Sequence, residues 1–303
     1  MTRSFNHQNQ LIGQPTRGKT ARNRLRRTDI FLILYAEHLL RLQSNQYSQP
    51  YFVDLGFGAE AHTTLESAQR FRKVNPTLPV LGIEIDPARV AAAKPYEDAI
   101  TQFRLGGFNI PLQSGETVRL IRAFNVLRQY EEHQVSDAHH LMASQLVPGG
   151  LVFEGTSDPY GRIWAANLLR KQFAFNGNSA LIREGIVFGT NFRWGFEPAI
   201  FQPVLPKNYI HRMQPGESIY EFMQAWKEAA RITTPYKTFG LRQWFAASAH
   251  CLMQMGYKVE LRDRFLKRGF LVWKFEQPLL INPPSQQLNL TKISGQGQLH
   301  RIP

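Results

Sequence analysis

The stretch Val53–Ala61, "VDLGFGAEA", places an acid and two glycines directly after an apolar run, and this spacing sets the fold expected for the chain. The run "YFVDL" at 51–55 predicts a buried strand of the parallel-sheet kind. Gly56 and Gly58 permit a tight turn and let a ligand approach the backbone closely. We expect Thr63 or Thr64 to cap a helix that follows. A strand, a glycine turn and a helix in this order are typical of an α/β domain.

The same alternation continues along the chain. "VLGIEI" at Val80–Ile85 predicts a second strand, and "DPARVAAAK" predicts a helix with Asp86 as N-cap and Pro87 in its first turn. Strands follow near 102–105, 118–124 and 151–155, with a helix at 131–146 before the last. We therefore expect a doubly wound parallel sheet that binds its ligand at the carboxyl ends of the strands.

The remaining segments divide the chain into six parts. "FNGN" at 175–178 signals a hairpin, prolines punctuate the region after Pro198, and "YKVELRDRFLKRGFLVWKF" predicts two closing antiparallel strands. The expected parts are a basic flexible arm (1–27), an N-terminal helix (28–50), a ligand-binding core (51–155), an insertion or lid (156–235), a segment that completes the core (236–276) and a tail (277–303).

Composition excludes several classes of protein. Hydrophobic residues make up 43% and charged residues 19% of the 303 residues, and no apolar run is long enough to span a bilayer. No secretory signal is visible, so we expect a cytoplasmic protein without a membrane partner. The single cysteine, Cys251, excludes an internal disulfide and a cysteine-based metal site, and we expect no metal.

The net charge of +13 is concentrated at the N-terminus. Seven cations lie in the first 27 residues, before the first acid, Asp29. Such an arm could follow the phosphate backbone of RNA, or it could simply keep the protein soluble.

The glycine turn raises two alternatives for the ligand. "GFGAEA" fits the dinucleotide fingerprint, with Glu84 at the distance where an acid binds a ribose. However, a carboxylate at Asp54 facing the ligand would repel pyrophosphate at short range. S-adenosyl-L-methionine carries an ammonium and a sulfonium and no phosphate, so Asp54 favours it as the cofactor.

"VDLGFG", "LGIEID" and the closing strands make the chain similar to the class I S-adenosylmethionine-dependent methyltransferases over residues 51–155 and 238–276. "RLRR", "RAFNVLRQY" and "EGTSDPYGR" resemble an uncharacterised bacterial family of methylases. The resemblance implies a Rossmann-like sheet of seven strands whose last strand is antiparallel, with an insertion after strand five. It assigns the ribose hydroxyls to Glu84, and adenine contacts to Ile85, Phe108 and Asn109. The full set expected to bind the cofactor is Asp54, Gly56, Phe57, Gly58, Glu84, Ile85, Phe108 and Asn109.

The acceptor of the methyl group is expected at the ends of strands four and five. Asn125 and Glu154 are the candidate catalytic residues, with Arg128, Tyr130 and Asp158 nearby. Three functions stay open: a methyltransferase acting on RNA, a small-molecule methyltransferase with 156–235 as lid, and a non-catalytic protein that binds nucleic acid or a partner. The RNA alternative depends on the basic arm and on a group of aromatic residues beside Arg193, namely Phe192, Trp194 and Phe196.

Overall fold

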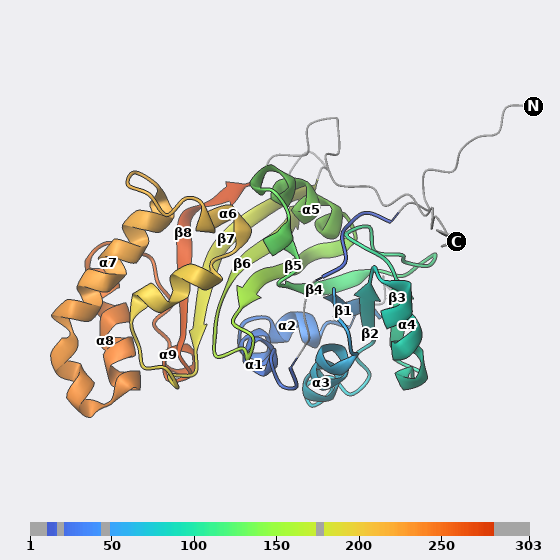
Figure 1. The fold of residues 1–303 in the computed structure, drawn as a ribbon, viewed down its shortest axis with the longest axis horizontal. Helices are drawn as coiled ribbons and strands as arrows, with labels where there is room; N and C mark the ends of the chain where they lie inside the picture. Colours follow the sequence, from blue (N-terminus) through green and yellow to red (C-terminus); the bar gives the residue numbers. More distant parts are fainter. Residues whose placement is uncertain (1–10, 17–20, 44–48, 174–178, 282–303) are drawn as a thin grey trace, which may run out of the picture.

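The computed structural model describes residues 11–16, 21–43, 49–173 and 179–281, and its named strands form one mixed sheet (Figure 1). The strand order is β3-β2-β1-β4-β5-β6-β7-β8. Strands β1 to β5 are parallel, whereas β6, β7 and β8 each run antiparallel to the preceding strand. Their bounds are β1 Tyr51–Leu55, β2 Val80–Glu84, β3 Thr101–Leu105, β4 Val118–Phe124, β5 Leu146–Ser157, β6 Ile163–Phe173, β7 Ser179–Thr190 and β8 Phe270–Leu280.

Helices cover both faces of the sheet, which confirms the doubly wound α/β fold. In Figure 1, α1, α2 and α3 lie below the sheet, α5 lies above it, and α7 and α8 pack at the β8 end. The helices are α1 Arg26–Tyr35, α2 Glu37–Leu40, α3 His62–Phe71, α4 Pro87–Ala93, α5 Glu132–Ser144, α6 Lys207–Ile210, α7 Ser218–Ile232, α8 Leu241–Gln254 and α9 Asp263–Leu266. Shorter 3₁₀ turns are η2 Lys94–Tyr96, η3 Leu127–Gln129, η4 Pro198–Val204 and η5 Thr234–Phe239.

Successive side chains of each strand pack into the hydrophobic cores on opposite faces of the sheet. Phe52 packs with the α1 and α3 side chains, and its neighbour Val53 packs with those of α5. Because successive residues of a strand point to opposite faces, a strand buried on both faces reads as one apolar run. This is why "YFVDL" was recognisable as a strand.

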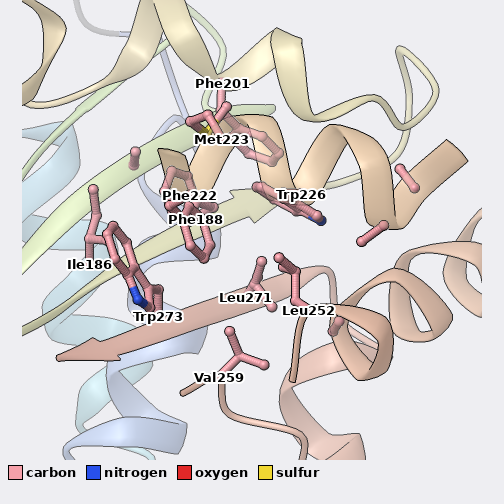
Figure 2. Close-up of a cluster of buried hydrophobic side chains, with 14 of the residues drawn as sticks. Ile186, Phe188, Phe201, Phe222, Met223, Trp226, Leu252, Val259, Leu271 and Trp273 are labelled. Atoms are coloured by element: carbon pink, nitrogen blue, oxygen red, sulfur yellow. The ribbon is translucent and has the colours of Figure 1, made fainter. Parts of the chain in front are cut away.

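The region 156–235 differs from the expected insertion. The strands β6 and β7 directly extend the main sheet, so the sheet has eight strands rather than seven. The remainder of the region packs on these strands through aromatic side chains (Figure 2). Phe222 of α7, for example, stacks on Trp273 of β8 with ring centroids 4.1 Å apart. The two strands form the predicted hairpin, while the turn "FNGN" itself lies outside the described residues.

The closing antiparallel pair is present but shorter than predicted: the Glu260 N–H donates to the Val272 carbonyl, and the Lys274 N–H donates to the Lys258 carbonyl. Residues 258–262 contribute one isolated bridge, Val259 to Trp273, and α9 follows them. Gly269, at φ 71°, then turns the chain into β8, which pairs with β7. A glycine accepts this left-handed conformation without steric cost. Strand β8 also extends past 277, where the tail was expected to begin, and 282–303 lie outside the described residues.

The described part of the N-terminal arm is docked rather than loose. Leu25 is buried among α1 and sheet residues, and Arg24 Nε donates to Ser157 Oγ and to the Asp158 carbonyl at 3.2 Å each. The helix α1 begins at Arg26, and Thr28 donates to the Leu25 carbonyl within it instead of capping it. A buried apolar residue within a basic segment anchors that segment to the core.

Beneath the parallel strands lies a fully buried charged cluster. Arg122 of β4 is 0% exposed and forms ion pairs with Asp54 of β1, at 2.9 Å, and with Asp29 of α1. Arg70 of α3 also pairs with Asp29, at 2.8 Å. Burial raises the pKa of the Asp29 carboxyl, against the charges of Arg122 and Arg70. The cluster thus joins α1, α3, β1 and β4.

We expect Arg122→Met to lower the free energy of unfolding by about 3–5 kcal/mol, because it leaves the Asp54 carboxylate buried without a cation and leaves Asp29 with Arg70 alone. Urea denaturation followed by circular dichroism measures the loss. The control is Arg231→Met, which removes an exposed arginine paired with Glu228 on α7 and should leave stability within error. A loss below about 1 kcal/mol for Arg122→Met would contradict the structural role of the cluster.

Candidate ligand site at the strand tips

The loops that follow β1, β2, β3 and β4 meet at the carboxyl edge of the parallel strands and enclose a small pocket. We call it the strand-tip pocket. Its cavity has a volume of only about 20 Å³, roughly the space of one water molecule. Its walls are Leu55, Gly56, Glu84, Ile85, Gly106, Gly107, Phe108, Val126 and Tyr130, together with Ile12, Gly13, Gln14 and Thr16 of the N-terminal segment.

Glu84 supplies the carboxylate of this pocket. It ends β2, it is 1% exposed, and backbone N–H groups hold both of its oxygens: Gly58 donates to Oε2 and Ile85 to Oε1, each at 2.9 Å. The Arg89 guanidinium lies 3.7 Å from Oε2. The carboxylate is therefore held in one orientation at the edge of the pocket, as a site for sugar hydroxyls requires.

The turn "GGFN" after β3 forms the opposite wall. Phe108 is buried and packs edge-on against Tyr130, with ring centroids 5.3 Å apart. The Phe108 N–H donates to the Ile12 carbonyl at 2.9 Å, and the Asn109 side-chain oxygen accepts from the Ile12 N–H at 3.0 Å. Phe108 and Asn109 thus present a donor beside an acceptor.

Asp54 was predicted to face the ligand, and the structure contradicts this. Its side chain points to the opposite face of the sheet, where it accepts from Thr63 Oγ1 at 2.7 Å and Thr64 Oγ1 at 2.9 Å and pairs with Arg122. It is 2% exposed and does not line the strand-tip pocket. The parity of β1 explains the error: side chains alternate along a strand, and Asp54 shares its face with Phe52. The two threonines serve Asp54 instead of capping α3, which begins at His62.

The other predicted cofactor residues divide into two groups. Gly56, Ile85 and Phe108 line the pocket as expected. Phe57 is buried against Phe103, outside the pocket lining, and Gly58 contributes its N–H to Glu84. Gly56 adopts φ 72°, and a Cβ there would approach Val126 to 2.7 Å, so the turn requires glycine.

A second, larger cavity opens at the ends of β4 and β5, and we call it the β4–β5 cavity. Its volume is about 720 Å³, within the range of small-ligand sites. Its walls are Arg24, Asn125, Arg128, Gln129, Ser157, Asp158, Pro159, Ile163, Trp194, Pro203 and Val204. The loop after β4 contributes to both cavities: Val126 and Tyr130 line the strand-tip pocket, whereas Asn125, Arg128 and Gln129 line this one.

Two polar residues of this cavity have distinct environments. Asn125 holds φ 60°, and its amide is bonded to Ser157 on both sides: Nδ2 donates to Ser157 Oγ at 3.2 Å, and Oδ1 accepts from the Ser157 N–H at 3.0 Å. Asp158 accepts two N–H bonds at Oδ1, whereas its buried Oδ2 has no hydrogen-bond partner among the described residues. Asp158 thus forms part of the cavity wall, and Asn125 positions the β5 tip.

Glu154, the other predicted catalytic residue, lies elsewhere. It is 1% exposed, accepts from Asn167 Nδ2 at 2.7 Å and lies 3.4 Å from His139 Nε2. Burial lowers the pKa of His139, against the charge of Glu154. Glu154 lines none of the cavities described above, so its network belongs to the core between α5 and β6.

The aromatic residues predicted to contact RNA are only partly exposed. Phe196 is buried and Phe192 is partly buried in the core of α7 and α8. Trp194, in contrast, is 54% exposed at the rim of the β4–β5 cavity, near the 60% exposed Tyr160. The Arg162 guanidinium lies over both rings, 4.6 Å from the Tyr160 centroid and 4.9 Å from that of Trp194.

Sequence reasoning missed the N-terminal residues of the strand-tip pocket. Ile12, Gly13, Gln14 and Thr16 lie in a segment that was expected to be a flexible arm. The sequence offers only a weak indication of this docking, because Gly13 and Pro15 mark a turn within an otherwise polar stretch. Gly106 and Gly107 were also overlooked, although a Cβ at Gly107 would approach the Ile12 carbonyl to 2.0 Å.

Comparison with known proteins gives a fold likeness. No family model and no curated protein matches the chain. Among solved structures, it is similar to LepI in complex with S-adenosylmethionine (17% identity, 41% of this chain and 30% of that chain, TM-score 0.31). It is also similar to the N-methyltransferase NodS from Bradyrhizobium japonicum (18% identity, 45% of this chain and 68% of that chain, TM-score 0.30). A third similar structure is CalS10, an amino pentose methyltransferase from Micromonospora echinaspora (16% identity, 54% of this chain and 70% of that chain, TM-score 0.31). The chain spans less than a third of the LepI chain. At these identities the likeness concerns the fold, and an activity has to be argued from the residues themselves.

The described residues lack two further features. They contain no helix with the length and apolarity needed to cross a membrane. They also contain no group of three or more potential metal ligands drawn from His, Cys, Asp and Glu.

We expect Glu154→Leu to lower the free energy of unfolding by roughly 1–3 kcal/mol, because Asn167 and His139 lose a buried acceptor. Urea denaturation measures this loss. Glu197→Gln, at an exposed glutamate, is the control and should match wild type. A Glu154→Leu protein of unchanged stability would argue against the core assignment.

Proposed function

We propose that the protein is an S-adenosyl-L-methionine-dependent methyltransferase and that its acceptor is RNA. The observation that carries the proposal is the combination of a fixed carboxylate, Glu84, at the tip of β2 with a sheet that turns antiparallel directly after β5. A single nucleoside fits this arrangement because only the first half of the sheet has the parallel strand–helix units that bind one.

The same features speak against a dinucleotide. A dinucleotide site uses a second parallel half of the sheet, whereas here β6, β7 and β8 form antiparallel pairs. The Gly58 N–H, which would be needed for pyrophosphate, is bonded to the Glu84 carboxylate. Asp54 does not affect the choice between these ligands, because it pairs with Arg122 away from the pocket.

The residues of the strand-tip pocket fit an adenine nucleoside in their chemistry. Glu84 is an acceptor for ribose hydroxyls, Ile85 and Phe108 offer apolar surfaces for the base, and the Phe108 N–H with the Asn109 oxygen matches an edge that carries an acceptor beside a donor. The hydroxyl of Tyr130 is buried at the pocket, beside Gly13 of the N-terminal segment. Burial raises the pKa of Tyr130 to about 12, so this hydroxyl stays protonated.

The cofactor supplies a methyl group on a sulfonium, and the chain has to align the acceptor and exclude water. The β4–β5 cavity is our candidate for the acceptor. Asp158 lines this cavity and is our candidate partner for the acceptor group, and Asn125 fixes the strand tip that carries Ser157 and Asp158. Glu154 is not part of this site, because it is buried and bonded to Asn167.

An RNA acceptor is favoured by the rim of the cavity. The exposed Trp194 and Tyr160 rings flank Arg162, and Arg24 and Arg128 line the walls. Exposed aromatic rings stack on bases, and guanidinium groups contact phosphates. The competing small-molecule methyltransferase draws support from Pro203 and Val204 of η4, which close one side of the cavity.

The cofactor is tested by thermal shift. S-adenosylmethionine should raise the Tm by roughly 5 °C at saturation, whereas NAD should leave it unchanged. Glu84→Ala should remove most of this rise, while Glu60→Ala, at an exposed acid in the glycine turn, should retain it. Stabilisation by NAD alone would overturn the proposal.

The acceptor is tested by RNA binding. Trp194→Ala should weaken binding of a transcribed RNA pool roughly 5- to 100-fold, the effect of losing one stacked base. Phe239→Ala removes a 71% exposed aromatic residue from η5 and should bind like wild type. Equal binding by both variants, with methylation of a small acceptor, would favour the competing function.

A further inference from the structure

The segment Leu11–Thr16 lies across the strand-tip pocket, and we call it the strap. Three tethers hold it: the Ile12 backbone bonds to Phe108 and Asn109, the Gln14 carbonyl accepts from Gln129 Nε2 at 3.1 Å, and Thr16 accepts twice from Arg89 at 3.0 Å. The residues that hold the strap lie in the loop after β3, in η3 after β4 and in α4 after β2, next to the walls of the pocket.

The Ile12 peptide groups reproduce the hydrogen bonds of an adenine edge. The base pairing edge of adenine carries a ring nitrogen that accepts beside an amino group that donates. Ile12 presents the same pair: its carbonyl accepts from the Phe108 N–H, and its N–H donates to the Asn109 oxygen. The strap and an adenine would therefore use the same two protein groups.

The strap also takes up the space of the base and the sugar. Gly13 is buried, and a Cβ there would stand 3.1 Å from Ile85 Cδ1 and 3.4 Å from the Tyr130 hydroxyl. Thr16 reaches Arg89, which lies beside Glu84. With the strap in place the cavity is about 20 Å³, far below the several hundred Å³ of a small-ligand site.

Because the strap uses the same hydrogen-bonding groups and the same space as an adenine nucleoside, we propose that it is an internal competitor of the cofactor. It closes the strand-tip pocket, and an adenine nucleoside binds only after the strap has left. The proposal rests on the proposed function, since it regulates the same site. The apparent affinity for the nucleoside is then lowered by the fraction of molecules with the strap docked.

Binding of S-adenosylhomocysteine to the full chain, measured by calorimetry, tests the competition. Ile12→Pro removes the N–H that bonds to Asn109, and Gly13→Val crowds Ile85; neither changes a pocket wall that the nucleoside needs. Each variant should bind roughly 3- to 30-fold more tightly than wild type, because one or two strap contacts are lost. Pro15→Ala, at an exposed position of the strap, is the matched control and should stay within about twofold.

Unchanged or weaker binding by both strap variants, with binding by wild type, would overturn the strap proposal and leave the proposed function standing. Failure of wild type and variants alike to bind would overturn both.

Hydrogen exchange on the unmodified protein gives a second readout that needs no variant. Saturation with S-adenosylhomocysteine should speed exchange of the strap amides, because the strap is displaced. Slower exchange of these amides would show that the strap closes over the ligand as a wall, and would overturn the proposal.

Discussion

The buried guanidinium of Arg122, held between Asp54 and Asp29, is the interaction on which the strand tips depend. Asp54 also holds the hydroxyls of Thr63 and Thr64, so the cluster fixes where α3 begins relative to β1. The glycine turn lies between these two ends. Because it is tied on both sides, its geometry follows from charges that never contact a ligand.

A buried charge cluster of this kind adds little net stability but tolerates only one arrangement of its members. Desolvation of three ions costs free energy that only well-aligned ion pairs recover. Removal of one partner leaves the other ions buried with fewer opposite charges. The cluster therefore favours one arrangement of α1, α3, β1 and β4 over its alternatives. Strand β2, which carries Glu84, pairs with β1, so the cluster also helps to fix the position of the Glu84 carboxylate.

Much of the fold could be predicted from the sequence because the strands are buried on both faces. "YFVDL" and "VLGIE" are buried throughout and carry one acid each, and each is followed by a helix start. The route of the chain after β5 could not be predicted in the same way. The placement of β6 and β7 in the main sheet depends on pairing with β5 and β8, and β8 comes from residue 270 onward. Local periodicity does not contain such long-range pairing.

The candidate site was predictable in its chemistry and less so in its orientation. Glu84, Ile85 and Phe108 line the pocket, since the ends of parallel strands meet at one edge. Asp54 and Glu154 were placed wrongly because an acid near a strand end can point to either face, and parity decides which. Asp158 was not a leading candidate, because the backbone N–H groups that hold its Oδ1 belong to a turn whose geometry the sequence does not indicate.

The dependence of β7 on a distant partner has a consequence for synthesis of the chain. Residues up to β7 emerge from the ribosome well before β8, so β7 spends that interval as an open sheet edge with unpaired backbone groups. The apolar side chains that α7 and α8 later cover are exposed with it. Nascent chains that stall in this interval would be targets for chaperones, although both cavities at the strand tips already have most of their walls.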